Sequence, residues 1–127
     1  MTLADETKLA IADRFARASR TNDGDTYAAL CAPDAMTWHN FDDAEVGTEQ
    51  TVRTVRWLHR TVTDLTWTDV ALHVTPTGWV SQTIMTGTAP GGPLRVHSCV
   101  IVTLDDDGLV TRVEEYLDPA QTAVLRS

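Results

Sequence analysis

The chain has 127 residues, of which 43% are hydrophobic and 22% charged. This length and composition fit one folded domain over residues 1–127 and exclude a disordered chain. The formal net charge of -8 argues against nucleic acid or an anionic membrane as a partner, because both bind basic surfaces. No apolar run is long enough to cross a bilayer, and the N-terminus lacks the pattern of a secretory signal, so we expect a cytoplasmic protein.

The first half of the chain predicts three helices and one strand. A helix is expected from Ala4 to about Arg20, and a short second helix follows the Asn22–Asp25 break and ends at Pro33. A strand over Ala35–Phe41 comes next. A third helix starts near Gly47, and its expected buried stripe consists of Val52, Val55, Leu58 and Val62.

The second half predicts only strands. The expected strands are Thr66–Thr75, Trp79–Thr88, Leu94–Leu104 and Leu109–Asp118. Two turns that contain glycine and proline separate the first three strands, and the Asp105–Gly108 turn precedes the last one. Helices followed by sequential hairpins indicate an α+β domain, in which an antiparallel sheet has its helices packed on one face around an apolar pocket.

The last expected strand contains the strongest candidate for chemistry. Alternation places Val113, Glu115 and Leu117 on the more apolar face, so Glu115 is expected to point inward. Burial would raise its pKa and suit it to general acid–base catalysis. A structural carboxylate paired with an arginine is an equally weighted alternative.

The end of the first strand contains Trp38, His39 and Asn40. We interpret His39 as a proton-transfer group, Asn40 as an orienting amide and Trp38 as a pocket wall. Alternation does not decide which of the three faces inward, and a surface histidine beside a core tryptophan is the alternative. Gln82 is a weaker candidate for substrate binding, and His97 is expected on the outer face.

Cofactor and metal binding are not expected. The four histidines have no metal-ligand spacing, and Gly91-Gly92 lies in a hairpin turn rather than at the start of a helix. The two cysteines, Cys31 and Cys99, are interpreted as free thiols.

Four segments, in this order and spacing, resemble the nuclear-transport-factor-2-like superfamily, in its SnoaL-like and ketosteroid-isomerase-like branch. They are Asp23–Asp25, Ala29–Asn40, Asp107–Val110 and Glu115–Asp118. The resemblance covers about Leu9 to Gln121. It implies a cone-shaped, highly curved sheet closed by three N-terminal helices around an apolar pocket, and a homodimer formed through the outer face of the sheet.

The resemblance also implies positions for site residues. The general base of ketosteroid isomerases falls at His39, or at Asn40 if the register slips by one. Their two oxyanion-binding groups fall at Phe15 and Val100, which are apolar here and are assigned to substrate binding. In limonene-type epoxide hydrolases, the water-holding pair falls at Trp38 and Asn40 and one acid falls at Glu115. Their other acid and their arginine fall at Thr86 and Ile84.

These observations lead to one main hypothesis and two alternatives. The main hypothesis is a cofactor-free acid–base enzyme, of isomerase, cyclase or dehydratase type, that acts on a small hydrophobic carbonyl, polyketide-like or terpenoid compound. The alternatives are a variant of the limonene-type epoxide hydrolases and a non-catalytic domain that binds a hydrophobic ligand or dimerises.

Overall fold

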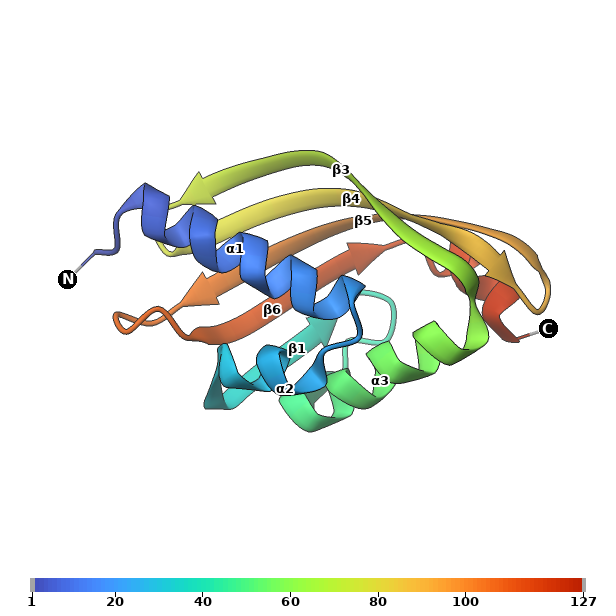
Figure 1. Cartoon of the computed structure of the whole chain (residues 1–127), viewed down its shortest axis with the longest axis horizontal. Coiled ribbons are helices and arrows are strands. Elements are labelled where there is room, and N and C mark those ends of the chain that lie inside the picture. The colour runs from blue at the N-terminus through green and yellow to red at the C-terminus, as the bar shows by residue number, and fades with distance from the viewer. Residues whose placement is uncertain (1, 127) are drawn as a thin grey trace.

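A six-stranded curved sheet, covered on its concave face by helices, forms the domain (Figure 1). The structure is a computed structural model and describes residues 2–126. The elements in chain order are α1 (Asp5–Arg20), α2 (Gly24–Ala29), β1 (Cys31–His39), β2 (Glu45–Gly47), α3 (Thr48–Thr61), β3 (Thr63–Thr75), β4 (Gly78–Ala89), β5 (Gly92–Leu104), β6 (Val110–Leu117) and the 3₁₀ helix η1 (Pro119–Arg126). The expected α+β class with three N-terminal helices is therefore confirmed.

The sheet is mixed, whereas the sequence predicted an antiparallel one. Its strand order is β2-β1-β6-β5-β4-β3. The strands from β3 to β6 pair antiparallel through hairpins, as expected, but β1 pairs with β6 in parallel. No turn joins β1 to β6, because these strands are the first and the last long ones of the chain, so hairpin signals could not reveal their relative direction.

The first strand differs from its prediction at both ends. It begins at Cys31, so α2 ends before Pro33 and this proline lies inside the strand. The register of β1 against β6 shifts between Cys31 and Met36, and such irregularities accommodate a residue that cannot donate a ladder hydrogen bond. The strand ends at His39, and the three-residue strand β2 was too short to be predicted.

Aromatic side chains form the main core beneath α1 and α2. The Phe15 ring lies 4.6 Å from the Tyr27 ring and 5.9 Å from the Trp79 ring, measured between centroids. All three are buried in one cluster with Val102 and Val110. A second cluster joins β5 to η1, in which Leu125 packs with Leu94 and Val96.

The apolar stripe of α3 behaves differently from its prediction. No residue within α3 is buried, and Val62, which is buried, follows the end of the helix. Thr51, Val55 and Leu58 instead line a cavity beneath the helix. Val52 and Leu58 also pack against the two core clusters, so the apolar pattern of α3 reflects contact with both an internal space and packed side chains.

Candidate functional site

A cavity of about 840 Å³ occupies the space between the helices and the concave face of the sheet. Its walls are mostly apolar and aromatic. Phe15 and Val100, which the sequence placed at the pocket, both line it. Three tryptophans also line it, namely Trp57, Trp67 and Trp79. A largely apolar cavity with a few polar groups is the usual form of a small-molecule site.

Glu115 points into this cavity from β6. Val113 and Leu117, two residues before and after it, line the same cavity, which confirms the inward face predicted from alternation. The intervening residue Glu114 lies on the opposite face, where its carboxylate is 3.8 Å from the guanidinium of Arg112. The alternative of a structural carboxylate paired with an arginine is not supported, because the ion-pair and hydrogen-bond contacts of the Glu115 carboxylate within residues 2–126 are with His39 and Ser98.

The parallel pairing of β1 with β6 brings His39 beside Glu115. The two residues are direct neighbours in the register, as are Trp38 and Glu114 on the other face. Thr37 and His39 therefore line the cavity, whereas Trp38 and Asn40 do not. The structure thus decides the question that strand alternation left open.

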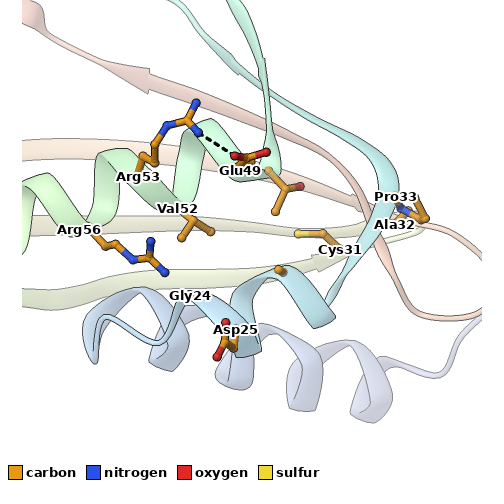
Figure 2. Close-up of a pocket in the computed structure, with 11 residues that line it drawn as sticks. Gly24, Asp25, Cys31, Ala32, Pro33, Glu49, Val52, Arg53 and Arg56 are labelled. Carbon is orange, nitrogen blue, oxygen red and sulfur yellow. Dashed lines mark hydrogen bonds and ion pairs between the residues drawn. The ribbon is translucent and has the colours of Figure 1, made fainter.

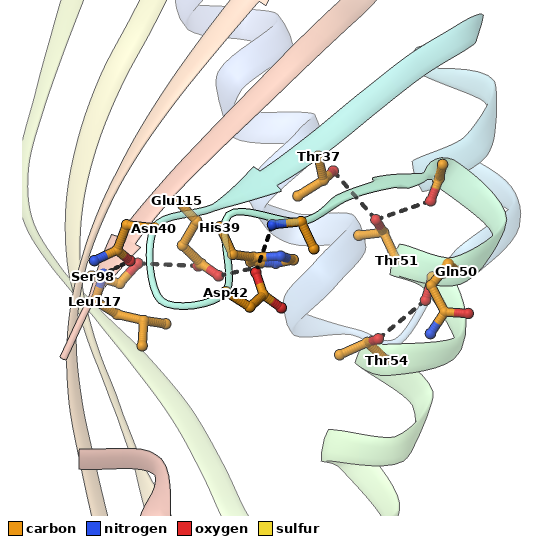
Figure 3. A network of polar contacts seen from close by, with 12 residues as sticks. Thr37, His39, Asn40, Asp42, Gln50, Thr51, Thr54, Ser98, Glu115 and Leu117 are labelled. Atoms are coloured by element: carbon orange, nitrogen blue, oxygen red, sulfur yellow. Dashed lines mark hydrogen bonds and ion pairs between the residues drawn. The ribbon is translucent and has the colours of Figure 1, made fainter. Parts of the chain in front are cut away.

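The two proton-transfer candidates are close but not hydrogen-bonded to each other. His39 Nε2 lies 3.8 Å from Glu115 Oε1. Ser98 Oγ donates a hydrogen bond of 3.2 Å to Glu115 Oε2, so the second carboxylate oxygen is held while the first faces His39 (Figure 3). A ligand atom placed between the ring and Oε1 could contact both groups.

Burial dominates the electrostatics of Glu115. Desolvation raises the pKa of this carboxyl, while His39 and the Ser98 hydrogen bond oppose the rise. About 30% of the side-chain surface stays accessible, because this part faces the cavity. The net effect is a carboxyl whose pKa lies above its ordinary value, as acid–base catalysis near neutral pH requires.

We expect Glu115→Gln to raise the free energy of unfolding at neutral pH by about 0.5–2 kcal/mol, since glutamine keeps the shape but carries no charge to desolvate. A carboxyl with a raised folded-state pKa stabilises the fold fully below its unfolded pKa and loses this contribution as pH rises through its folded pKa. The gain should therefore be small near pH 4, grow toward about pH 8, and be measured by urea denaturation. A variant that is less stable than the wild type at the alkaline end would instead identify Glu115 as a stabilising ion-pair partner.

A chain of hydroxyl groups on the cavity wall was missed in the sequence. Thr51 Oγ1 lies 3.2 Å from Thr37 Oγ1 and 3.2 Å from the Gly47 carbonyl, and the Tyr27 hydroxyl is hydrogen-bonded to Thr37. Burial raises the pKa of Tyr27, so its hydroxyl stays protonated. In the sequence, Thr37 alone could have indicated this chain of hydroxyl groups, because it stands two residues before His39 and therefore shares the same face of the strand.

Trp38 and Asn40 have contacts outside the cavity. Trp38 Nε1 donates a 2.6 Å hydrogen bond to Asp43 Oδ1, and its ring packs edge-on against Tyr116 at 5.2 Å. Asn40 Oδ1 accepts a 3.0 Å hydrogen bond from the Leu117 amide, so it fastens the end of β1 to β6. Neither residue reaches the cavity in this structure, and the water-holding pair implied by the resemblance to epoxide hydrolases is not assembled there.

Gln82, expected to bind substrate from an inward-facing position, lies away from the cavity, because its strand presents the alternate set of residues to the pocket. The cavity-facing residues of β4 are Trp79, Ser81, Thr83 and Met85. Gln82 pairs with Cys99 on the outer face, together with Val80 and Ile84. The error arose because the outer face of β4 is as apolar as its inner face. The outward position of His97 was predicted correctly, and its amide donates to Gln121 Oε1 at 2.9 Å.

A second, shallower groove lies between α2 and α3 (Figure 2). Its volume is about 530 Å³, and both Arg53 and Arg56 of α3 line it; Figure 2 shows Arg53 pointing toward Glu49 and Arg56 toward α2. Arg53 pairs with Glu49 at 2.9 Å, and burial raises the pKa of the Cys31 thiol. The groove therefore contains one arginine paired with a glutamate, a second arginine, Arg56, and a thiol whose burial favours its protonated form.

Residues 2–126 contain neither a helix suited to the membrane nor a cluster suited to a metal ion. No helix there is long and apolar enough to cross a membrane. No cluster of three or more histidine, cysteine, aspartate or glutamate side chains in this part of the chain could hold a metal ion.

The curved sheet, the three helices that cover it and the cavity between them identify the chain as a small α+β domain with an internal ligand pocket. The family model for the SnoaL-like domain matches residues 12–113, and the chain belongs to this family. The resemblance inferred from the sequence is therefore confirmed. A comparison with curated proteins gives no match.

Solved structures share the fold at low sequence identity. PrhC from Penicillium brasilianum is 17% identical, with a TM-score of 0.82 over 94% of this chain and 85% of that one. BvnE pinacolase from Penicillium brevicompactum is 17% identical, with a TM-score of 0.81 over 95% and 90%. An LEH-like epoxide hydrolase from M. tuberculosis is 17% identical, with a TM-score of 0.73 over 95% and 91%. These proteins share the architecture, and the reactions named for the pinacolase and the epoxide hydrolase are those proteins' own.

Proposed function

We propose that the protein is a cofactor-free acid–base enzyme that acts on a small, uncharged, hydrophobic carbonyl compound of polyketide-like or terpenoid type. The observation that carries the proposal is the juxtaposition of His39 and Glu115, 3.8 Å apart, in a mostly apolar cavity. On a carbonyl compound, double-bond isomerisation, aldol cyclisation and loss of a β-hydroxyl group can all begin with removal of a proton next to the carbonyl group.

The proposed step uses the two groups together. The Glu115 carboxylate takes a proton from the α-carbon, the C–H electron pair forms the C=C bond of an enol, and protonated His39 gives its proton to the carbonyl oxygen. The carbonyl oxygen and the α-carbon are two bonds apart in a ketone, so one substrate can contact both groups. The apolar walls exclude water and strengthen these polar interactions.

Exchange of α-protons for deuterium tests the proposal without knowledge of the true substrate. The protein is incubated in D₂O with a panel of uncharged cyclic ketones, and incorporated deuterium is measured by mass spectrometry. We expect exchange above the buffer rate in the wild type and its loss in Glu115→Gln. Oxygen-18 transfer from water into a diol across an epoxide panel, without ketone exchange, would favour the epoxide hydrolase alternative. Retention of a ligand without chemical change would favour a binding domain.

We also propose a homodimer that forms through the outer face of the sheet. Val80, Ile84 and Ile101 give the centre of this face an apolar character, and Tyr116 at its side is among the exposed large hydrophobic residues. Exposed apolar surface of this kind is typical of protein interfaces. Sedimentation should give twice the 13.9 kDa mass of one chain, and a single-chain mass at micromolar concentration would contradict the proposal.

A further inference from the structure

The cavity reaches solvent along one side of α1. Three large apolar residues line the cavity and yet are strongly exposed, namely Leu9 on α1 (42%) and Val70 and Leu72 on β3 (59% and 44%). Glu115, which faces the interior of the cavity, keeps only about 30% of its side-chain surface accessible, so the larger exposed fractions of these three residues indicate that the cavity opens to the surface there. These residues therefore mark an opening between α1 and β3, here called the α1–β3 slot.

The topology of the sheet explains why this side is open. β3 is an edge strand, so no further strand covers it. Its register against β4 shifts between Asp69 and Ala71, which leaves Val70 as an unpaired bulge residue. A bulge bends its strand and redirects a side chain, and here it presents an apolar residue at the rim of the cavity.

Two polar tethers bound the slot at its ends. Lys8, which is buried, donates from Nζ to the carbonyl oxygens of Thr75 and Pro76 at 2.8 and 3.2 Å. Arg20 forms a two-pronged pair with Asp69 at 3.2 and 2.5 Å. The tethers fix both ends of α1 to β3, and Figure 1 shows α1 over the concave face with its first turns beside the end of β3.

The tethers differ in strength. Lys8 is buried, so the loss of its contacts would leave its ammonium group inside the fold without these hydrogen-bond partners. The Arg20–Asp69 pair is partly exposed, with 72% of the Asp69 side chain accessible, and exposed pairs contribute little free energy. The Arg20 end of the slot is therefore the end that can open.

We propose that the α1–β3 slot is the entrance through which uncharged apolar ligands reach the cavity. In this proposal the Arg20–Asp69 pair is a strap, an ion pair that holds one end of the slot closed until it breaks. The rim fits this ligand class because its charges cancel locally. Besides the strap, Arg17 at the rim pairs with Asp13 at 2.7 Å. An anionic or cationic ligand would gain no unpaired partner there, whereas Leu9, Val70 and Leu72 offer apolar contact.

A competing opening lies on another side of the molecule. Phe41 also lines the cavity with 43% of its surface exposed, and its ring packs against the His39 ring at 5.2 Å. The experiment must therefore separate the two routes. It should also be independent of catalysis, so that its failure differs from a failure of the proposed function.

The test measures how fast an uncharged thiol reagent reaches a cysteine inside the cavity. Val100 lines the cavity and is the register partner of Glu115 on the neighbouring strand, so Val100→Cys places the thiol on the cavity wall beside Glu115. Cys31→Ala and Cys99→Ala remove the native thiols. N-phenylmaleimide then adds across its double bond to the thiol sulfur, and mass spectrometry gives the rate.

We expect Val70→Trp and Leu72→Trp each to slow labelling by about tenfold, as a barrier increase of about 1.4 kcal/mol would do. Asp69→Asn should accelerate labelling by about threefold, because it releases an exposed pair. The double exchange Arg20→Asp with Asp69→Arg should restore the original rate. His73→Trp is the matched control, since it adds the same ring to the outer face of the same strand and should change nothing.

A different pattern would overturn the proposal. Unchanged labelling in both slot variants, with slower labelling in Phe41→Trp, would assign entry to the Phe41 opening. Equal slowing by His73→Trp would show that the added ring acts through the fold rather than through the slot. Because two slot positions are tested, misfolding of one variant leaves the other to decide.

Discussion

Glu115→Gln is expected to lower the rate of α-proton exchange by about 10²- to 10⁴-fold, the usual contribution of a positioned general base. Glutamine has nearly the same shape, and its amide oxygen can still accept the Ser98 hydrogen bond that Glu115 Oε2 accepts. It cannot take a proton from carbon. Ligand binding should therefore be retained, so that kcat falls while KM changes little.

Glu114→Gln is the matched control for this experiment. The residue is the next one on β6 and lies on the outer face, where it approaches Arg112 at 3.8 Å. The same substitution there removes one charge without touching the cavity, and the exchange rate should stay at the wild-type level. Equal losses in both variants would point to net charge or folding. Full exchange in Glu115→Gln would remove Glu115 from the mechanism.

The wild-type pH profile should reflect the environment of this carboxyl. Exchange requires the ionised form of Glu115, and burial raises the pKa of its carboxyl. The acid limb of the profile should therefore lie above the usual range of glutamate. Ser98 donates a hydrogen bond that favours ionisation, so it is a positioning residue that keeps the limb from moving still higher.

The inward position of Glu115 could be predicted because alternation along β6 separates an aliphatic face from a charged one. Phe15 and Val100 could be placed at the pocket because the family resemblance fixes helix and strand positions over most of the chain. Both inferences rely on local periodicity or on a complete pattern of elements.

The position of His39 required information that local patterns do not contain. Trp38, His39 and Asn40 follow one another, and both faces of β1 have apolar and polar members. Only the parallel pairing with β6 decides the face, and it joins segments far apart in the chain. Gln82 was misplaced for a similar reason. When the outer face of a sheet is apolar, for example because two chains associate through it, alternation along the strand cannot distinguish that face from the inner one.

The α3 stripe shows a further limit of pattern analysis. Apolar periodicity indicates which face of a helix avoids water, but not whether that face meets a packed core or a cavity. Val55 and Leu58 are half-buried because the curved sheet leaves a cavity beneath this part of the helix, and only the three-dimensional structure shows this. A cavity is a property of curvature and spacing, neither of which the pattern encodes.

His39→Gln is expected to lower exchange by about 10²-fold or more, because the carbonyl oxygen then lacks a proton donor. Glutamine can still donate a hydrogen bond, so some polarisation of the carbonyl remains. His97→Gln is the matched control, since this histidine lies on the outer face and should be neutral for exchange. A His39→Gln variant with wild-type exchange would show that Glu115 works without it.

The pH profile and a double variant distinguish a working pair from two independent residues. His39 lowers the pKa of Glu115, so its removal lets the pKa of that carboxyl rise. The residual exchange of His39→Gln should therefore have its acid limb at higher pH than the wild type. If the two groups act on one substrate in one step, His39→Gln/Glu115→Gln should be no slower than the slower single variant. Losses that multiply would instead mean that the 3.8 Å proximity of Nε2 and Oε1 has no part in the reaction.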